Sequence, residues 1–239
     1  MMRLSTFIGF DPRPAEVQSF AIARESILAN LSSMMPVRGL VLSRLRAQGL
    51  YTRKHERRDG RLFDTISQAP MSTEFAISRF LTPHLAGEGW ALFMDADMMV
   101  RGNLHRLFDL ADPSKAVMVV KHDYRPDATV KMDNQAQQQY GRKNWSSVML
   151  FNCDHPAVKA LTPEIVNSAR GLWLHQFGWL DDDMIGELPP EWNWLVGHSS
   201  PEIDPKIVHF TEGVPSMPGY ENAPYADEWW RYLERWAER

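Results

Sequence analysis

The feature that most constrains this chain is an apolar strand that ends in two aspartates. Trp90-Ala91-Leu92-Phe93-Met94 is a continuous apolar run, typical of a strand buried on both faces, and it leads directly into Asp95-Ala96-Asp97. Side chains alternate along a strand, so the two carboxylates point the same way and repel each other. Oxygen ligands around a hard divalent cation relieve this repulsion. The pattern predicts a Mn²⁺ or Mg²⁺ site formed by Asp95 and Asp97.

The N-terminal segment predicts the opening of an α/β sheet. Residues 4–8 and 37–42 have the apolar pattern of strands, and apolar residues at helical spacing between Pro14 and Leu31 predict the helix that joins them. Ligands of such sheets collect at the carboxyl ends of the strands, and Asp11 lies at such an end. We therefore expect one α/β domain over residues 1–239, because the chain has a suitable length and contains no internal repeat.

The other expected elements follow from the same kinds of pattern. Residues 44–69 are polar and lack a period, which favours an irregular loop. Ser72 or Thr73 is expected to cap a helix that carries Arg79. The aromatic-rich helix over 225–239 is expected to dock on the core, ahead of a dimer contact or a membrane contact. We also expect strands over 116–120, 147–151 and 207–208, and a helix over 156–168.

Composition excludes some classes of protein. The formal charge of -4 and the mixed signs along the chain provide no basic field for nucleic acid. No run approaches the roughly 20 apolar residues of a membrane span, and the N-terminus lacks the features of a signal peptide. The single cysteine, Cys153, favours a reducing compartment. A cytoplasmic protein is expected, with peripheral membrane association and homodimer formation left open.

Further candidate residues lie far from Asp95 in the sequence. His209 follows the short apolar strand at 207–208 and offers an imidazole as a third metal ligand. Asp181-Asp182-Asp183 serves either as a helix start, where acids complement the helix dipole, or in sugar binding and chemistry. Cations that can hold phosphate or acceptor groups are Arg79, Lys121, Arg125, Arg142 and Lys143.

Taken in order, these segments resemble the family 8 glycosyltransferases, the group that includes glycogenin and bacterial galactosyltransferases. The resemblance covers most of the chain and is weakest over 44–69 and after Tyr220. The segments that carry it are Phe7-Ile8-Gly9-Phe10-Asp11, Ser78-Arg79-Phe80, Leu92-Phe93-Met94-Asp95-Ala96-Asp97, Ser146-Ser147-Val148-Met149-Leu150-Phe151-Asn152, Leu180-Asp181-Asp182-Asp183-Met184-Ile185, Glu191-Trp192-Asn193 and Val208-His209-Phe210-Thr211-Glu212-Gly213.

The resemblance implies a GT-A fold, with a mixed central sheet flanked by helices. It implies a nucleotide-binding half over about residues 1–120 and an acceptor- and sugar-binding half over about 121–239. The implied reaction moves a sugar from a nucleotide-diphosphate sugar, a UDP-sugar, to a carbohydrate, lipid-linked or protein acceptor with retention. The implied metal ligands are Asp95, Asp97 and His209. The implied donor-binding residues are Asp11, Arg79, Asp95, Ala96, Asp97, Lys121, Trp145 and Ser146, and the implied catalytic residues are Asp181 and Asp182.

Three departures from the family pattern affect the sugar-handling side. Trp145 stands where the family has a sugar-contacting Asn, and Asp182 where it has a Gln near the anomeric carbon. The lysine expected shortly after His209 is missing, and Lys121 or Arg142 is the candidate replacement. Two other functions stay open. A nucleotidyltransferase would need a glycine-rich basic loop after the first strand, and a catalytically inactive carbohydrate-binding relative would not need both Asp95 and Asp97.

Overall fold

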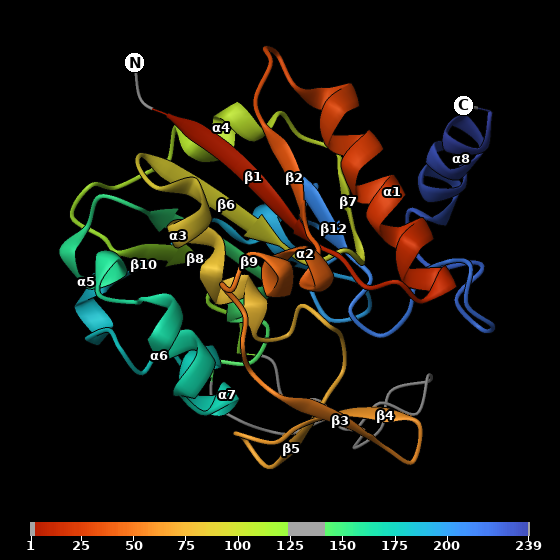
Figure 1. Cartoon of the computed structure of the whole chain (residues 1–239). Coiled ribbons are helices and arrows are strands. Elements are labelled where there is room, and N and C mark those ends of the chain that lie inside the picture. The colour runs from red at the N-terminus through yellow and green to blue at the C-terminus, as the bar shows by residue number, and fades with distance from the viewer. Residues whose placement is uncertain (1–2, 124–141, 239) are drawn as a thin grey trace.

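The computed structural model describes residues 3–123 and 142–238. Its centre is a six-stranded mixed sheet in the order β10-β8-β9-β6-β1-β2 (Figure 1). These strands are β1 (Leu4–Gly9), β2 (Val37–Leu40), β6 (Trp90–Met94), β8 (Val117–Val119), β9 (Val148–Asn152) and β10 (Ile185–Glu187). Every residue of β6 is buried, as the unbroken apolar run predicts.

Strand directions decide which segments meet at one edge of this sheet. β1 runs parallel to β2 and to β6, and the connection from β1 to β2 is the predicted helix α1 (Pro14–Asn30). β9 runs antiparallel to β6, so Met94 at the end of β6 pairs with Val148 at the start of β9. The short 3₁₀ helix η2 (Trp145–Ser147) that precedes β9 therefore lies beside the aspartates that follow β6.

A second sheet continues from those aspartates. β7 (Met98–Val100) pairs antiparallel with β12 (Ile207–His209), which pairs with β11 (Trp194–Leu195). Helix α8 (Ala226–Ala237) buries Trp229 against this region, and Figure 1 shows it running beside α1. Docking of the C-terminal helix is thus confirmed. Among the residues described here, no helix has the length and apolar content needed to cross a membrane.

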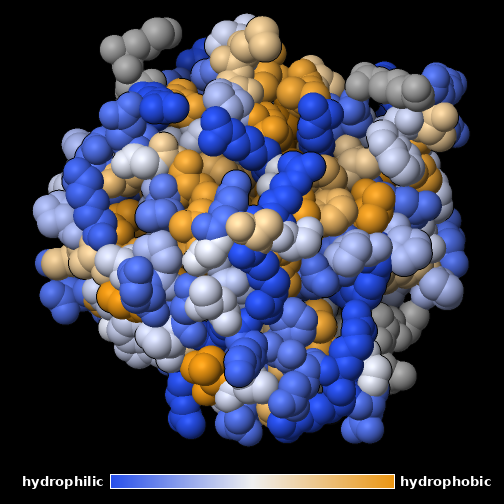
Figure 2. Space-filling view, in the orientation of Figure 1, coloured by the Kyte–Doolittle hydropathy of each residue, from blue (hydrophilic) through white to orange (hydrophobic). Residues whose placement is uncertain are grey.

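The prediction of an irregular loop over 44–69 is wrong. This segment completes α2 (Leu42–Ala47) and forms a third sheet from β3 (His55–Arg58), β4 (Arg61–Asp64) and β5 (Ala69–Met71). The strands lack a clear apolar period because part of what they bury is an ion pair. Arg53 and Asp64 are almost fully buried, and the outward residues of β3 are exposed and charged. Hydrophilic side chains predominate over the lower part of Figure 2, where this sheet lies in Figure 1.

Two helix predictions also need correction. Residues 72–77 form turns, because Glu74 N–H donates to the Asp11 carboxylate and Arg13 donates to Ser72 O; helical structure starts only at the 3₁₀ helix η1 (Ser78–Leu81). The helix expected over 156–168 is divided into α5 (Pro156–Lys159) and α6 (Pro163–Ser168), because a proline has no N–H to donate and disfavours helical backbone in the residue before it.

The remaining helices are short. They are α3 (Thr82–Ala86), α4 (Leu104–Phe108), α7 (Gly171–His175), and the 3₁₀ helices η3 (Asp182–Met184) and η4 (Pro190–Asn193). In Figure 1, α5, α6 and α7 lie on the side of the view opposite α1 and α8.

The third sheet is attached through Arg53 to α6 and to the turn that follows it. Its guanidinium donates to both oxygens of Asp64 and to Val166 O and Ala169 O. Burial alone would raise the pKa of Asp64, but the hydrogen bonds from Arg53 and Ser67 outweigh it and lower this pKa. The ion pair therefore stabilises the fold above the ordinary pKa of an aspartate, and this contribution is lost as the pH falls through the lowered value.

We predict that Arg53→Met destabilises the protein by about 3 kcal/mol or more, because it leaves Asp64 buried without its cation. The measurement is the free energy of unfolding in urea at pH 7. Arg58→Met is the matched control, since Arg58 pairs with Glu56 on the surface and such pairs contribute less than about 1 kcal/mol. Equal destabilisation by the two substitutions would contradict the role given to Arg53.

Candidate metal and donor site

The two aspartates at the end of β6 are held by the backbone around them. Asp95 N–H donates to Ser147 O at 3.0 Å, and Phe210 N–H donates to Asp97 O at 2.9 Å. The first hydrogen bond joins residues 95–97 to η2. The second joins them to the segment that follows β12. Ala96 between them is fully buried. The carboxylates are consequently placed by the sheet itself.

His209 completes a three-residue group, as the sequence suggested. It pairs with Met98 across the β12–β7 ladder, which brings a residue more than a hundred positions away next to Asp97. The potential ligand atoms of Asp95, Asp97 and His209 all lie within 4.8 Å of one another. We call these three residues the triad.

The hydrogen bond on the far side of His209 determines what its imidazole offers. His209 Nδ1 lies 3.0 Å from Asn193 Oδ1, while Asn193 Nδ2 donates to Ser147 Oγ at 2.9 Å. The Asn193 oxygen accepts, so Nδ1 carries the hydrogen, and in the neutral ring Nε2 keeps its lone pair. That Nε2 lies 3.5 Å from Asp97 Oδ1. In that tautomer a lone pair and a carboxylate oxygen face each other, an arrangement that a metal ion or a proton on Nε2 would relieve.

The pKa of Asp95 reflects the closeness of the two carboxylates. Burial and the neighbouring Asp97 raise the pKa of Asp95 to about 6, although the guanidinium of Arg79 acts against both. Arg79 NH1 lies 2.8 Å from Asp95 Oδ1 and also donates to Ser146 O. Arg79 therefore compensates one carboxylate but leaves the pair short of positive charge.

The triad fits a divalent metal ion. Two carboxylates and one imidazole are a donor set that Mn²⁺ accepts well, and Mg²⁺ shares the preference for oxygen. The Asn193–His209 hydrogen bond is the kind of outer contact that orients a metal-binding histidine. The sequence alone marks Asn193 only as part of the Glu191-Trp192-Asn193 segment and predicts no role for it.

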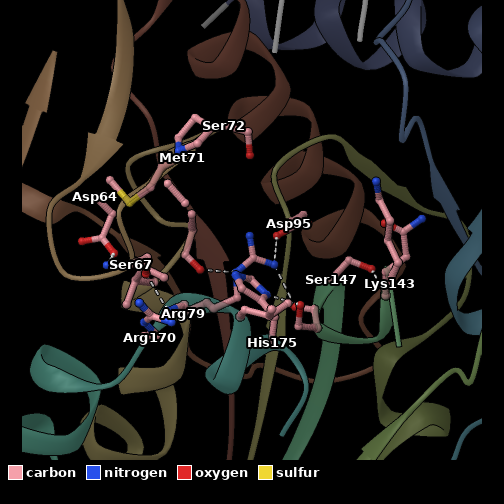
Figure 3. A pocket seen from close by; sticks show the side chains of 18 of the residues that line it. Asp64, Ser67, Met71, Ser72, Arg79, Asp95, Lys143, Ser147, Arg170 and His175 are labelled. Atoms are coloured by element: carbon pink, nitrogen blue, oxygen red, sulfur yellow. Dashed lines mark hydrogen bonds and ion pairs between the residues drawn. The ribbon is translucent and has the colours of Figure 1, made fainter. Parts of the chain in front are cut away.

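Two cavities meet at the triad. The smaller, of about 100 Å³, is lined by Asp95, Asp97 and His209 together with the N-terminal part of α1 and the segment after β12. The larger, of about 380 Å³, lies between β5, η2 and α7. Arg79, Asp95 and Asn144 line both. Figure 3 shows the larger cavity, with Arg79 and Asp95 between Met71 on one side and Lys143 on the other.

Ser146 and His175 form a buried pair in the wall of the larger cavity. Ser146 Oγ lies 2.7 Å from His175 Nδ1. Burial, with a further contribution from Arg79, lowers the pKa of His175 to about 3, so its ring is neutral at pH 7. Ser146 was predicted to bind the donor and does line the cavity. His175 was missed, because nothing in the sequence around a lone histidine marks it.

Other predicted site residues lie apart from the two cavities as the described residues define them. Asp11 is buried, but its carboxylate accepts from Arg13 and from Glu74 N–H beside the third sheet. Asp181 is exposed, and the side chain of Asp182 is 84 % exposed and pairs with Arg142. The structure therefore does not bring Asp11, Asp181 or Asp182 to the triad.

Trp145 lies close to two cations. Arg142 Cζ is 5.4 Å and Lys121 Nζ 5.8 Å from its ring centroid, and its Nε1–H donates to His122 O. These are the two cations that the sequence offered as replacements for the missing lysine. Arg125 lies outside the described residues.

Comparison with known proteins gives one near relative. Protein CDI of Arabidopsis thaliana is 41% identical over 236 residues, which cover 96% of this chain and 86% of that protein. The chain belongs to the Protein CDI family. That name states no activity. No family model matches the chain.

Solved structures give the fold. The WbbM bifunctional glycosyltransferase has a TM-score of 0.63 at 14% identity over 97% of this chain, which spans only 50% of the WbbM chain. The galactosyltransferase LgtC, in complex with donor and acceptor sugar analogs, has a TM-score of 0.58 at 15% identity, with 97% of this chain and 95% of that chain covered. The expected fold class, a GT-A fold with a mixed sheet flanked by helices, is confirmed.

The raised pKa of Asp95 predicts a pH effect on stability without metal. A proton is held more tightly by folded than by unfolded Asp95, so its contribution to the free energy of unfolding falls as the pH rises from about 4 to about 6. Asp95→Asn removes this loss, and should therefore gain up to about 3 kcal/mol relative to the unmodified chain between pH 4 and pH 7.

The measurement is urea unfolding of both proteins at several pH values in the presence of a chelator. Saturating Mn²⁺ should reverse the order at pH 7, because the ion stabilises only the chain that keeps both carboxylates. A difference between the two proteins that does not change with pH would contradict the charge balance described for the triad.

Proposed function

We propose that this chain is a metal-dependent glycosyltransferase that moves a sugar from a nucleotide-diphosphate sugar, a UDP-sugar, to an acceptor. The observation that carries the proposal is the triad itself, which stands on a GT-A fold where two cavities meet. Retention of configuration, and membership of family 8 in particular, are proposed from the motif resemblance.

Asp95, Asp97 and His209 would hold the metal, Mn²⁺ or Mg²⁺. When bound, the ion would neutralise the negative charge of the donor diphosphate as the nucleotide leaves. Asn193 keeps the His209 ring in place, and Arg79 holds Asp95 while its guanidinium remains at the junction of the cavities. The chain thus supplies preorganised ligands, so that a bound ion would present its positive charge to the donor with little rearrangement.

We assign the donor diphosphate to the smaller cavity, because the triad lines it, and the reacting sugars to the larger cavity next to it. Ser146 lines the larger cavity, which supports its proposed contact with the donor, whereas Ala96 is fully buried and lines neither cavity, so its proposed contact has no support from the cavity lining. Contact of Asp11 with the nucleoside, of Lys121 and Trp145 with the donor, and catalytic roles for Asp181 and Asp182 remain proposals. For Asp182, the proposal requires that the surface pair with Arg142 separates when substrates bind.

The assignment of nucleotide binding and acceptor binding to different parts of the chain is also a proposal. We treat residues 1–239 as one domain, with nucleotide binding in about 1–120 and acceptor binding in about 121–239. The acceptor is a carbohydrate, a lipid-linked molecule or a protein. The single cysteine is buried, and burial raises its pKa to about 12, so it is a core residue rather than a nucleophile. A reducing, cytoplasmic location is proposed on that basis.

We predict that Asp97→Ala abolishes metal-dependent binding of UDP. Loss of a direct ligand should weaken Mn²⁺ affinity by more than the roughly 10- to 100-fold typical of outer-shell changes. The measurement is calorimetric titration of UDP with and without Mn²⁺, followed by a search among UDP-sugars for slow hydrolysis. Asp109→Asn, at an exposed aspartate on the C-terminal side of α4, is the control. UDP binding that needs no metal, or that survives in Asp97→Ala, would remove the proposed function.

A further inference from the structure

Ser147 is linked to two of the three triad residues, directly to Asp95 and through Asn193 to His209. Its carbonyl accepts from Asp95 N–H at 3.0 Å. Its hydroxyl accepts from Nδ2 of Asn193 at 2.9 Å, and Asn193 Oδ1 lies 3.0 Å from Nδ1 of His209. Ser147, Asn193 and His209 are all buried, so little water competes for these hydrogen bonds. The geometry of the triad therefore depends on a residue that is not itself a ligand.

The direction of the hydrogen bonds in this network is fixed at the end that lies away from the triad. Ser147 Oγ donates to the backbone carbonyl of Asn144 at 2.6 Å, and a carbonyl oxygen can only accept. A hydroxyl has one hydrogen, so the Ser147 oxygen can only accept from Asn193. The Asn193 amide consequently turns its NH₂ group to Ser147 and its oxygen to His209.

The carbonyl that ends the network is held by the turn before β9. Asn144 has left-handed backbone, with φ 64°, a conformation that asparagine adopts more readily than most residues. Its carbonyl also accepts from Ser147 N–H and from Asn193 Nδ2, each at 3.3 Å. The bond from Asn193 is long, but it favours the same orientation of the amide. The turn thus provides a fixed acceptor from which the direction of the whole network follows.

The orientation of the amide decides which nitrogen of His209 is available to a ligand. When the ring has one hydrogen, the neighbouring oxygen of Asn193 keeps this hydrogen on Nδ1, and Nε2 has none. Nε2 is the nitrogen that faces the triad, 3.5 Å from Asp97 Oδ1. With the amide reversed, its NH₂ group would face Nδ1, the hydrogen would move to Nε2, and it would block a metal ion there.

We propose that Ser147 is a positioning residue of the triad. Through Asn193 it keeps Nε2 of His209 free of hydrogen and able to bind a metal ion, while its carbonyl holds the backbone of Asp95. The inference deepens the proposed function and rests on it, because it assigns a role in metal binding. The hydrogen position on His209 can nevertheless be measured in the metal-free protein, without donor or acceptor.

The first measurement is nitrogen NMR of the isotopically labelled protein in the presence of a chelator, at a pH high enough that the His209 ring carries one hydrogen. Loss of the signals in His209→Gln assigns them. In the unmodified chain the hydrogen should be on Nδ1. Asn193→Leu should move most of it to Nε2, because Nδ1 then lacks its acceptor.

Ser147→Ala should move part of the population in the same direction, because only the longer bond to Asn144 then orients the amide. Ser26→Ala is the matched control: it removes another buried hydroxyl that is hydrogen-bonded to backbone, and it should leave the tautomer unchanged. A hydrogen on Nε2 in the unmodified chain, or no shift in Ser147→Ala, would overturn the proposal.

A double substitution separates positioning from a general disturbance of packing. In Asn193→Asp both ends of the side chain are acceptors, so its orientation no longer matters and the hydrogen should stay on Nδ1. Ser147→Ala should therefore shift the tautomer when made alone and should have no effect in the Asn193→Asp background. Equal shifts in the two backgrounds would show that Ser147→Ala acts through packing, which would also overturn the proposal.

Metal affinity tests the consequence. Calorimetric titration with Mn²⁺ alone should show about tenfold weaker binding in Ser147→Ala, at the lower end of the effects measured for groups behind a metal ligand. Unchanged Mn²⁺ affinity would overturn the role of Ser147 in metal binding. If the tautomer behaves as described but the unmodified chain binds no Mn²⁺, the orientation of His209 by Ser147 stands and the proposed glycosyltransferase function falls.

Discussion

Two carboxylates at the end of a fully buried strand are the constraint around which this structure is arranged. Asp95 and Asp97 cannot both carry charge there without compensation, and Arg79 supplies only part of it. The hydrogen bond from His209 Nδ1 to Asn193 leaves Nε2 of His209 facing the same point. A divalent cation is the simplest group that satisfies all three side chains together, and the fold brings them within 4.8 Å.

A second buried carboxylate, that of Asp64 in the lining of the larger cavity, is also compensated by an arginine. Arg53 is buried with Asp64 and holds the third sheet against α6 and the turn that follows it, and Asp64 of this ion pair lines the larger cavity. The segment that Arg53 stabilises thus also contributes the residues of β5 that line this cavity.

Much of the centre of the fold could be predicted from the sequence. The run from Trp90 to Met94 is apolar throughout because both faces of β6 are covered, and the acids after it mark the end of the strand. The third sheet could not be predicted, because its interior contains Arg53 and Asp64 where a periodic pattern requires apolar residues. Asn144 and His175 line a cavity that distant segments create together, and no local spacing in the sequence signals such positions. Asp182 was selected by motif, yet the structure places it on the surface with Arg142.

The central claim is that Asp95, Asp97 and His209 bind one divalent cation, and pulsed electron paramagnetic resonance of bound Mn²⁺ tests it most directly. With UDP present, the spectrum should show nitrogen coupling from one imidazole and phosphorus coupling from the diphosphate. His209→Gln should remove the nitrogen coupling, whereas His198→Gln should keep it, since His198 pairs with Glu212 nearer the surface. Absence of nitrogen coupling in the unmodified chain, or its persistence in His209→Gln, would contradict the claim.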